Sequence, residues 1–146
     1  MAQSPIETLG VVTFLLMNSR EHQDLTLAQM RRMVLPPLDH GLAVTAKGKT
    51  GADGQSGEQP IAFALFARVS EEWDAALRAP DFELVNLPQE AWTSGDHQWL
   101  LLLVGRQGVT AKFAQEAAKA LFKAGSTVNI RLRDDAGGYG VREVIV

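Results

Sequence analysis

The sequence contains no cysteine in its 146 residues. Disulfide bonds, thiolate catalysis and cysteine-ligated zinc or iron–sulfur sites are therefore excluded, and the absence fits a cytoplasmic protein. Long apolar runs are missing too, because the longest, 11–17 and 100–104, are far too short to span a bilayer. The N-terminal residues have no basic segment before an apolar one, so we expect no secretory signal peptide.

Neither sign of charge is in strong excess, since 14 basic and 17 acidic side chains give a net charge of −3. The chain therefore lacks the general basic field that attracts nucleic acid, and we expect no nucleic-acid partner. Histidine is scarce, and His22, His40 and His97 do not have the paired spacing of metal ligands. We therefore expect no metal site.

Helix and strand signals alternate along the chain. Capping and stop signals predict helices at about 5–18, 26–35, 70–78 and 110–124, with Pro36-Pro37 and Gly125 as stops. Apolar or alternating runs predict strands at 42–45, 61–69, 82–87, 99–104, 128–132 and 144–146. The class is therefore α/β or α+β, with a central sheet and helices packed on it.

The segment from 47 to about 59 is rich in glycine and has no large apolar residue, which predicts a flexible loop. Residues 134–138 are expected to form the hairpin turn between the last two strands. No internal repeat is visible, and a chain of this length is expected to form one domain, 1–146.

Two short segments supply the side chains needed to move a proton near neutral pH. Ser19-Arg20-Glu21-His22 falls in the connection between the first two predicted helices, which would hold both of its ends. Trp92-Thr93-Ser94-Gly95-Asp96-His97-Gln98-Trp99 places an aspartate between two tryptophans, just before an apolar strand. Taken alone, each is more often an ordinary loop residue or core anchor. Brought together, a histidine and an aspartate are the minimum set for proton transfer.

Five motifs follow one another along the chain: Leu9-Gly10-x-Val12-x-x-Leu15, Ser19-x-x-His22, Val34-Leu35-Pro36, Pro60-Ile61-Ala62-Phe63-Ala64 and Trp92-Thr93-Ser94-Gly95-Asp96-x-x-Trp99. In this order and at this rough spacing, from about Leu9 to Leu103, the chain resembles the toxin-activating lysine acyltransferases. These enzymes are the partners of RTX haemolysin-type toxins. The Trp-Thr-Ser-Gly-Asp string is the most specific element of the resemblance.

The resemblance implies a fold similar to the GNAT acyltransferases, with a mixed central sheet and helices on both faces. It implies transfer of a fatty acyl group from acyl carrier protein to the ε-amino group of an internal lysine of a protoxin, in the cytoplasm, before the toxin is secreted. Some members are dimers, and acyl-acyl carrier protein is the donor rather than a permanently bound cofactor. The implied essential residues are His22 and Asp96, and the supporting ones are Ser19, Trp92, Ser94 and Gly95.

The chemistry is consistent with these roles. A lysine ammonium, with a pKa of about 10.4, must lose a proton before it can attack a thioester. We therefore assign His22 as the general base and Asp96 as the carboxylate that orients it. A covalent acyl-histidine is an open variant. Ser19 would either contact the thioester or, by a slight preference, cap the loop, and His97 is expected to be a surface residue.

An acyl chain also needs an apolar slot, and its donor needs a docking surface. Candidates for the slot, each equally suited to an ordinary core, are Phe63, Phe66, Trp92, Trp99 and Leu101. Acyl carrier protein is acidic and would bind a basic patch. Candidate docking residues are Arg31 and Arg32 near the end of the second helix, and Lys112, Lys119 and Lys123 along the last.

Two other functions stay open from the sequence. One is an acyl-coenzyme A-dependent N-acetyltransferase of the GNAT type. The other is a non-catalytic adaptor or chaperone that binds a secreted partner through the same surface. The acyl chain length, the target lysine and the oligomeric state are not determined by the residues.

Overall fold

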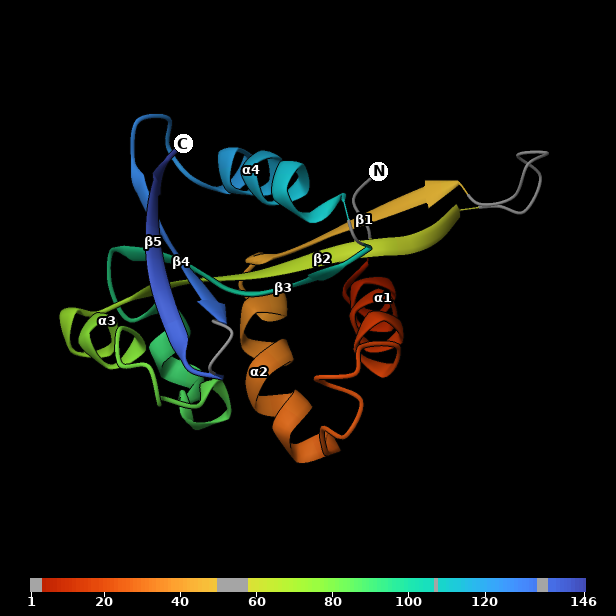
Figure 1. Ribbon diagram of the computed structural model, residues 1–146, viewed down its shortest axis with the longest axis horizontal. Helices are drawn as coiled ribbons and strands as arrows, with labels where there is room; N and C mark the ends of the chain where they lie inside the picture. The colour runs from red at the N-terminus through yellow and green to blue at the C-terminus, as the bar shows by residue number, and fades with distance from the viewer. Residues whose placement is uncertain (1–3, 50–57, 107, 134–136) are drawn as a thin grey trace.

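The computed structural model describes residues 4–49, 58–106, 108–133 and 137–146 (Figure 1). The helices are α1 (Pro5–Met17), α2 (Leu27–Asp39), α3 (Glu71–Leu77), α4 (Thr110–Leu121) and the short 3₁₀ helices η1 (Leu84–Asn86) and η2 (Gln89–Thr93). The strands are β1 (Ala43–Lys49), β2 (Glu58–Val69), β3 (His97–Gly105), β4 (Thr127–Arg133) and β5 (Tyr139–Ile145). This is an α+β fold, consistent with the expected GNAT-like architecture.

Capping residues begin the two N-terminal helices where the sequence indicates. Ser4 Oγ accepts a hydrogen bond from the backbone N–H of Glu7 at 3.2 Å, at the start of α1. Thr26 and Gln29 form a capping box at the start of α2, in which each side chain accepts from the other's backbone N–H, at 3.1 and 2.9 Å. These contacts satisfy N–H groups that have no partner inside the helix.

The expected helix stop at Pro36 and Pro37 is wrong, because α2 continues through both residues to Asp39. Proline lacks an N–H group, but its fixed φ is helical, so only the hydrogen bonds of one turn are lost. Both rings are buried, and the backbone N–H of Leu42 donates to the Pro37 carbonyl oxygen at 2.7 Å. Burial of the two rings favours the helical path, and the Leu42 bond satisfies one carbonyl group of the last turn.

The described strands lie in the order β1-β2-β3-β4-β5. All neighbours are antiparallel except β3 and β4, which are parallel and connected through α4. This parallel ladder joins only 98–100 to 128–130. Beyond it the strands separate, and β4 and β5 cross the direction of the first three strands steeply in Figure 1. We call the open region between 101–105 of β3 and 131–133 of β4 the wedge.

The first two strands are longer than the sequence indicates. Residues 47–49 of β1 pair with 58–60 of β2, so both ends of the expected glycine-rich loop belong to strands. The ladder satisfies backbone N–H and C=O groups whatever the side chains are, which is why polar residues extend it. The middle of that loop, 50–57, lies outside the described residues.

The strand expected at 82–87 is also wrong, because this segment contains η1. Leu84 and Leu87 are buried at a spacing of three, which suits a 3₁₀ turn rather than an alternating strand. Arg131 on β4 fixes the segment beside the sheet. Its guanidinium donates hydrogen bonds to the carbonyl oxygens of Leu77, Ala79 and Phe82.

The last helix begins at Thr110 as expected but ends at Leu121 rather than near Gly125. Phe122 is extended, and its ring packs edge-on against Phe66 of β2, with centroids 5.5 Å apart. Gly125 lies in the following turn with φ +85°, a conformation that favours glycine. Of the expected hairpin turn, 134–136 lie outside the described residues.

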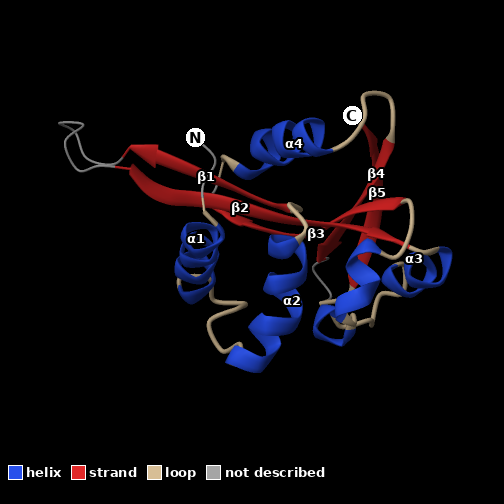
Figure 2. Cartoon of the chain, turned by 180° about the vertical axis from the view of Figure 1, so that it is seen from behind, coloured by secondary structure: helices blue, strands red, loops and turns tan. Residues whose placement is uncertain are grey.

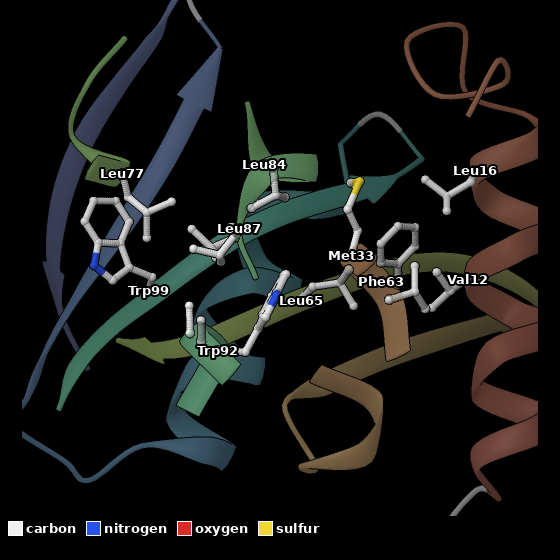
Figure 3. Packing of buried hydrophobic residues seen from close by; sticks show 14 of the residues in the cluster. Val12, Leu16, Met33, Phe63, Leu65, Leu77, Leu84, Leu87, Trp92 and Trp99 are labelled. Atoms are coloured by element: carbon white, nitrogen blue, oxygen red, sulfur yellow. The ribbon is translucent and has the colours of Figure 1, made fainter. Parts of the chain in front are cut away.

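Apolar side chains fill both faces of the sheet, with α1 and α2 on one face and α4 on the other (Figure 2). The cluster on the first face, drawn in Figure 3, includes Val12, Leu16, Met33, Phe63, Leu87, Trp92 and Trp99. The cluster under α4 includes Phe66, Leu100, Phe113, Ala117 and Phe122. Within the described ranges, no helix has the length and apolar character needed to cross a membrane.

Candidate active site

His22 lies in a loop of successive turns between α1 and α2. The backbone N–H of His22 donates to the Ser19 carbonyl oxygen at 3.0 Å, and Leu25 N donates to the His22 carbonyl oxygen at 3.2 Å. Ser19 Oγ is hydrogen-bonded to Nδ1 of the His22 ring at 2.8 Å. An ion pair of 3.8 Å between Glu21 and Arg133 ties the loop to β4. The imidazole is therefore held by its own loop and by the sheet.

The surroundings of His22 favour the neutral ring. Partial burial is the main reason that the pKa of the His22 imidazole lies below its ordinary value of 6.5. The Glu21 carboxylate works against this lowering of the pKa, and the Arg133 guanidinium adds to it. A neutral imidazole at pH 7 has one nitrogen free to accept a proton, which is what a general base requires.

A cavity of about 250 Å³ opens beside this ring. Its walls come from the His22 loop, the segment around η1 and the wedge side of β3 and β4. The lining residues are Glu21, His22, Leu25, Met33, Glu83, Leu84, Val85, Leu101, Leu102, Leu103, Arg131, Leu132, Arg133 and Tyr139. We call it the His22 cavity, and it combines an apolar floor with carboxylate and guanidinium groups.

The structure does not bring Asp96 to His22. Asp96 is exposed at the start of β3 and does not line the His22 cavity, and no hydrogen bond or ion pair joins the two side chains within the described residues. A strand rises roughly 3.3 Å per residue, so Asp96 precedes Leu101, where β3 first reaches this cavity, by about 17 Å. The expected orienting contact is replaced by Ser19, because the loop supplies its own partner for Nδ1.

Of the two roles expected for Ser19, the described hydrogen bonds do not include a cap on the loop by its hydroxyl. Its carbonyl oxygen, rather than its hydroxyl, accepts the turn hydrogen bonds of the loop, and the hydroxyl contacts the imidazole. A side-chain contact three residues away along a turn is a short-range feature. In the sequence, the Ser-x-x-His spacing is the pattern that corresponds to this contact.

The Ser94-Gly95 turn joins the start of β3 to the end of β2. Ser94 Oγ accepts from the backbone N–H of Ser70 at 2.9 Å and donates to the Ala91 carbonyl oxygen at 2.7 Å. A Cβ atom on Gly95 would lie 2.5 Å from the Val69 carbonyl oxygen, closer than real contacts allow. These supporting residues therefore have a structural role at this turn, away from the His22 cavity.

Comparison with known protein families shows to which family the chain belongs. The model of the RTX toxin acyltransferase family matches residues 1–144. The chain belongs to the RTX toxin acyltransferase family. Membership indicates acyl transfer in the activation of an RTX toxin, with an RTX protoxin as the protein substrate. The comparison with curated proteins gives no match.

The two tryptophans of this acyltransferase are core residues rather than walls of a cavity. Trp92 and Trp99 are both fully buried on the face covered by α1 and α2 (Figure 3). Trp99 Nε1 donates to Asp74 Oδ1 at 2.9 Å, whereas Trp92 Nε1 has no hydrogen-bond partner in the described part of the chain. The sequence predicts this core role as the more ordinary of the two possibilities.

Asp74 is a buried carboxylate that the sequence did not single out. Besides Trp99, it binds Arg78 at 3.0 Å and lies 3.7 Å from Nδ1 of His97. Acidic residues in the first turn of a helix are common, so nothing in the pattern 71–74 distinguishes it. Among the described residues, no group of three histidine and acidic side chains is placed to hold a metal ion.

The apolar candidates divide between the two faces of the sheet. Phe63 is buried among α1 and α2 and lines neither of the two cavities described for this chain, whereas Leu101 lines the His22 cavity. Phe66 lines a second cavity, of about 390 Å³, on the opposite face beneath α4. Of the aromatic candidates, Phe66 is therefore the one that lines either of these two cavities, as far as the described residues form them.

The basic candidates are exposed but do not form one surface. Arg31 and Arg32 lie on α2, on the same face of the sheet as His22, and Lys112 and Lys119 lie on α4, on the other face. Lys123 follows the end of α4 and is not part of the expected helical stripe. A single docking protein would meet one of these groups, not both.

Arg131, Arg133 and Tyr139 complete the His22 cavity and were not expected. The Arg131 guanidinium is buried and lies 3.9 Å from the Tyr139 ring centroid. The sequence contained one indication of this role. Arg131 stands between Ile130 and Leu132 in a predicted strand, and a charged residue at an inward position of a strand is unusual.

Proposed function

We propose that this protein transfers a fatty acyl group from acyl carrier protein to the ε-amino group of an internal lysine of an RTX protoxin, with His22 as general base. The observation that supports this proposal most is the His22–Ser19 contact at the edge of a cavity, in a chain of an acyltransferase family. The reaction belongs to the cytoplasm, before the toxin is secreted, and acyl-acyl carrier protein is a substrate rather than a bound cofactor.

The proposed proton balance assigns the proton of the His22–Ser19 contact to Nδ1 of the ring. Donation of the Nδ1 proton of His22 to Ser19 Oγ leaves Nε2 as the free acceptor. The ammonium group first releases one proton to solvent. Nε2 then takes a second proton from the amine as nitrogen attacks the thioester carbonyl carbon. The carbon–nitrogen bond forms, the carbon–sulfur bond breaks, and the imidazolium returns the proton to the departing carrier thiolate. The products are an amide on the protoxin and a free thiol on the carrier.

Charges at the His22 cavity suit a lysine substrate. The Glu21 carboxylate is paired with Arg133, and the Glu83 carboxylate also lines the cavity, where it would attract an incoming ammonium group. Once the amine is beside the imidazole, the lowered pKa of His22 keeps the base unprotonated at neutral pH. Asp96 is not the imidazole partner in this proposal, because it lies at the other end of β3.

The carrier most simply docks on the face that holds His22. Arg31 and Arg32 on the exposed side of α2 are the basic residues of that face among the expected candidates, and they suit an acidic carrier. Lys112 and Lys119 are then left for other contacts. Dimerisation is compatible with this arrangement but is not needed for it.

The test is acyl transfer to a purified protoxin, with the intact mass of the protoxin as readout and lysine assignment by peptide mapping. His22→Ala should lower the transfer rate at least about 100-fold. His40→Ala, a matched change at an exposed histidine beyond α2, should leave it unchanged. Circular dichroism of both variants checks the fold.

The outcomes separate the alternatives. Modification supported by acyl-coenzyme A but not by acyl carrier protein contradicts the proposed donor. Binding of the protoxin without a mass shift on any lysine contradicts catalysis and supports an adaptor. An acyl group found on His22 itself replaces direct transfer by a covalent route.

A further inference from the structure

The cavity beneath α4 is larger than the His22 cavity, and the proposed chemistry does not use it. It measures about 390 Å³, which lies within the range of about 300–1,000 Å³ for small-molecule sites. Phe66, Leu100, Val128 and Val144 contribute to its walls. We propose that this cavity, which we call the α4 cavity, holds the fatty acyl chain of the donor, an inference that rests on the proposed function.

The two cavities share two lining residues at the wedge. Leu103 of β3 and Leu132 of β4 line both the His22 cavity and the α4 cavity, although these lie on opposite faces of the sheet. The parallel ladder ends at 100 and 130, so no backbone hydrogen bonds close the sheet between these two leucines. A chain whose thioester lies beside His22 therefore reaches the α4 cavity by passing between Leu103 and Leu132.

The composition of α4 explains why the space is there. Its side toward the sheet presents Ala111, Ala114 and Ala118 to the cavity, where a packed amphipathic helix would place larger side chains. The small side chains therefore leave an apolar hollow that is open to solvent between α4 and the sheet. A bound hydrocarbon chain would supply the missing contacts and remove apolar surface from water.

Polarity assigns the acyl chain to this side and the reacting groups to the other. The His22 cavity includes two carboxylates and two guanidinium groups, which suit an ammonium and a polar thioester arm. A hydrocarbon chain there would displace water from these charged groups, which costs desolvation energy. In the α4 cavity the charged side chains are Lys119 and Arg142, and both are at least partly exposed, so they keep contact with water.

The proposal predicts that the size of residues facing the α4 cavity determines the chain length. Each buried methylene strengthens binding by about fourfold, so shortening the cavity penalises long chains selectively. Ala114→Phe should reduce transfer of tetradecanoyl relative to butanoyl chains by at least about tenfold. Ala120→Phe, at an exposed position of α4 outside the cavity, is the matched control and should leave this ratio unchanged.

Ala114 is nearly buried, so Ala118→Leu provides a milder second variant with the same expected direction. Transfer from acyl carrier proteins loaded with butanoyl, octanoyl and tetradecanoyl chains is measured for all variants. Direct binding of dodecanoate to the wild-type protein is followed by methyl NMR. The methyl signals of Ala114 and Val144 are expected to shift, and those of Ala120 are not.

Equal slowing of all chain lengths by Ala114→Phe and Ala118→Leu would overturn the proposal, since the cavity would then hold the carrier's arm. An unchanged length preference in both variants would overturn it too, while leaving the proposed acyl transfer intact. If no chain length is transferred, the proposed function fails by itself. Dodecanoate that shifts Ala114 and Val144 in that case still supports the cavity as a fatty-chain site.

Discussion

Ser19 Oγ and His22 Nδ1 lie 2.8 Å apart, within a single loop of the chain. This contact occupies the ring nitrogen that the sequence assigned to Asp96, and it leaves Nε2 available at the His22 cavity. A neutral hydroxyl stabilises an imidazolium less than a carboxylate does, so the base depends more on burial and on neighbouring charges. The consequences can be measured residue by residue.

The Ser19 hydroxyl should contribute modestly to the rate. Ser19→Ala is expected to lower kcat by about two- to tenfold, because one hydrogen bond that orients the ring is lost while the base itself remains. Steady-state transfer kinetics provide the measurement. Ser126→Ala, whose hydroxyl caps the distant Lys123 carbonyl, is the matched control. A Ser19→Ala variant with full activity would contradict a role of the Ser19 hydroxyl in orienting the ring.

The pH dependence of transfer should follow the His22 environment. Because burial lowers the pKa of His22, the acidic limb of kcat/KM should fall below pH 6.5, with activity lost as the ring gains a proton. Glu21→Gln removes the charge that raises this pKa and should move the limb to lower pH. Arg133→Gln removes one that lowers it and should move the limb to higher pH. Shifts in the same direction would contradict the electrostatic assignment.

Gly95 should be required for folding rather than for chemistry. Gly95→Ala would place Cβ 2.5 Å from the Val69 carbonyl oxygen, and the backbone shift should lower the free energy of unfolding by about 1–3 kcal/mol. Gly10→Ala is the matched control, because a Cβ there meets nothing within 4 Å in α1. It should stabilise the protein by about 0.5–1 kcal/mol. The free energy of unfolding of both variants is measured by urea denaturation. Equal effects of the two substitutions would contradict the structural role of Gly95.

Substitutions of Asp74 and Asp96 should differ in their effect on the stability of the protein. Asp74→Ala leaves the buried Nε1 of Trp99 without its acceptor and should cost about 1–3 kcal/mol in the free energy of unfolding. Asp96→Ala changes an exposed side chain and should stay within about 0.5 kcal/mol of wild type. Urea unfolding monitored by tryptophan fluorescence checks both values. The assignment fails if Asp96→Ala proves as destabilising as Asp74→Ala.

Local signals predicted most of the fold. Caps at Ser4 and Thr26 and the apolar run before Val104 mark elements that the structure confirms, because these preferences act within a few residues. The helix stop expected at Pro36 and Pro37 was wrong because burial of both rings outweighed their local helix-breaking tendency. The strand expected at 82–87 was wrong because this segment is held by contacts with residues far away in sequence, such as the hydrogen bond from Arg131 to the Phe82 carbonyl oxygen.

The candidate site was predictable to the extent that it is local. Ser19 and His22 are three residues apart, and their contact follows from one turn. The relation of His22 to Asp96 depends instead on which end of β3 lies beside the α1–α2 loop, and no short-range pattern contains that information. Likewise, Arg133 and Glu83 reach the His22 cavity only through the sheet and the η1 segment.

The most direct test of the central claim is the long-range ¹H–¹⁵N NMR spectrum of the His22 ring across a pH titration. We expect a ring protonated at Nδ1, with a pKa below 6.5 that shifts in Ser19→Ala and not in Asp96→Asn. A ring protonated at Nε2 would contradict the account. So would a pKa of His22 that shifts in Asp96→Asn and stays unchanged in Ser19→Ala.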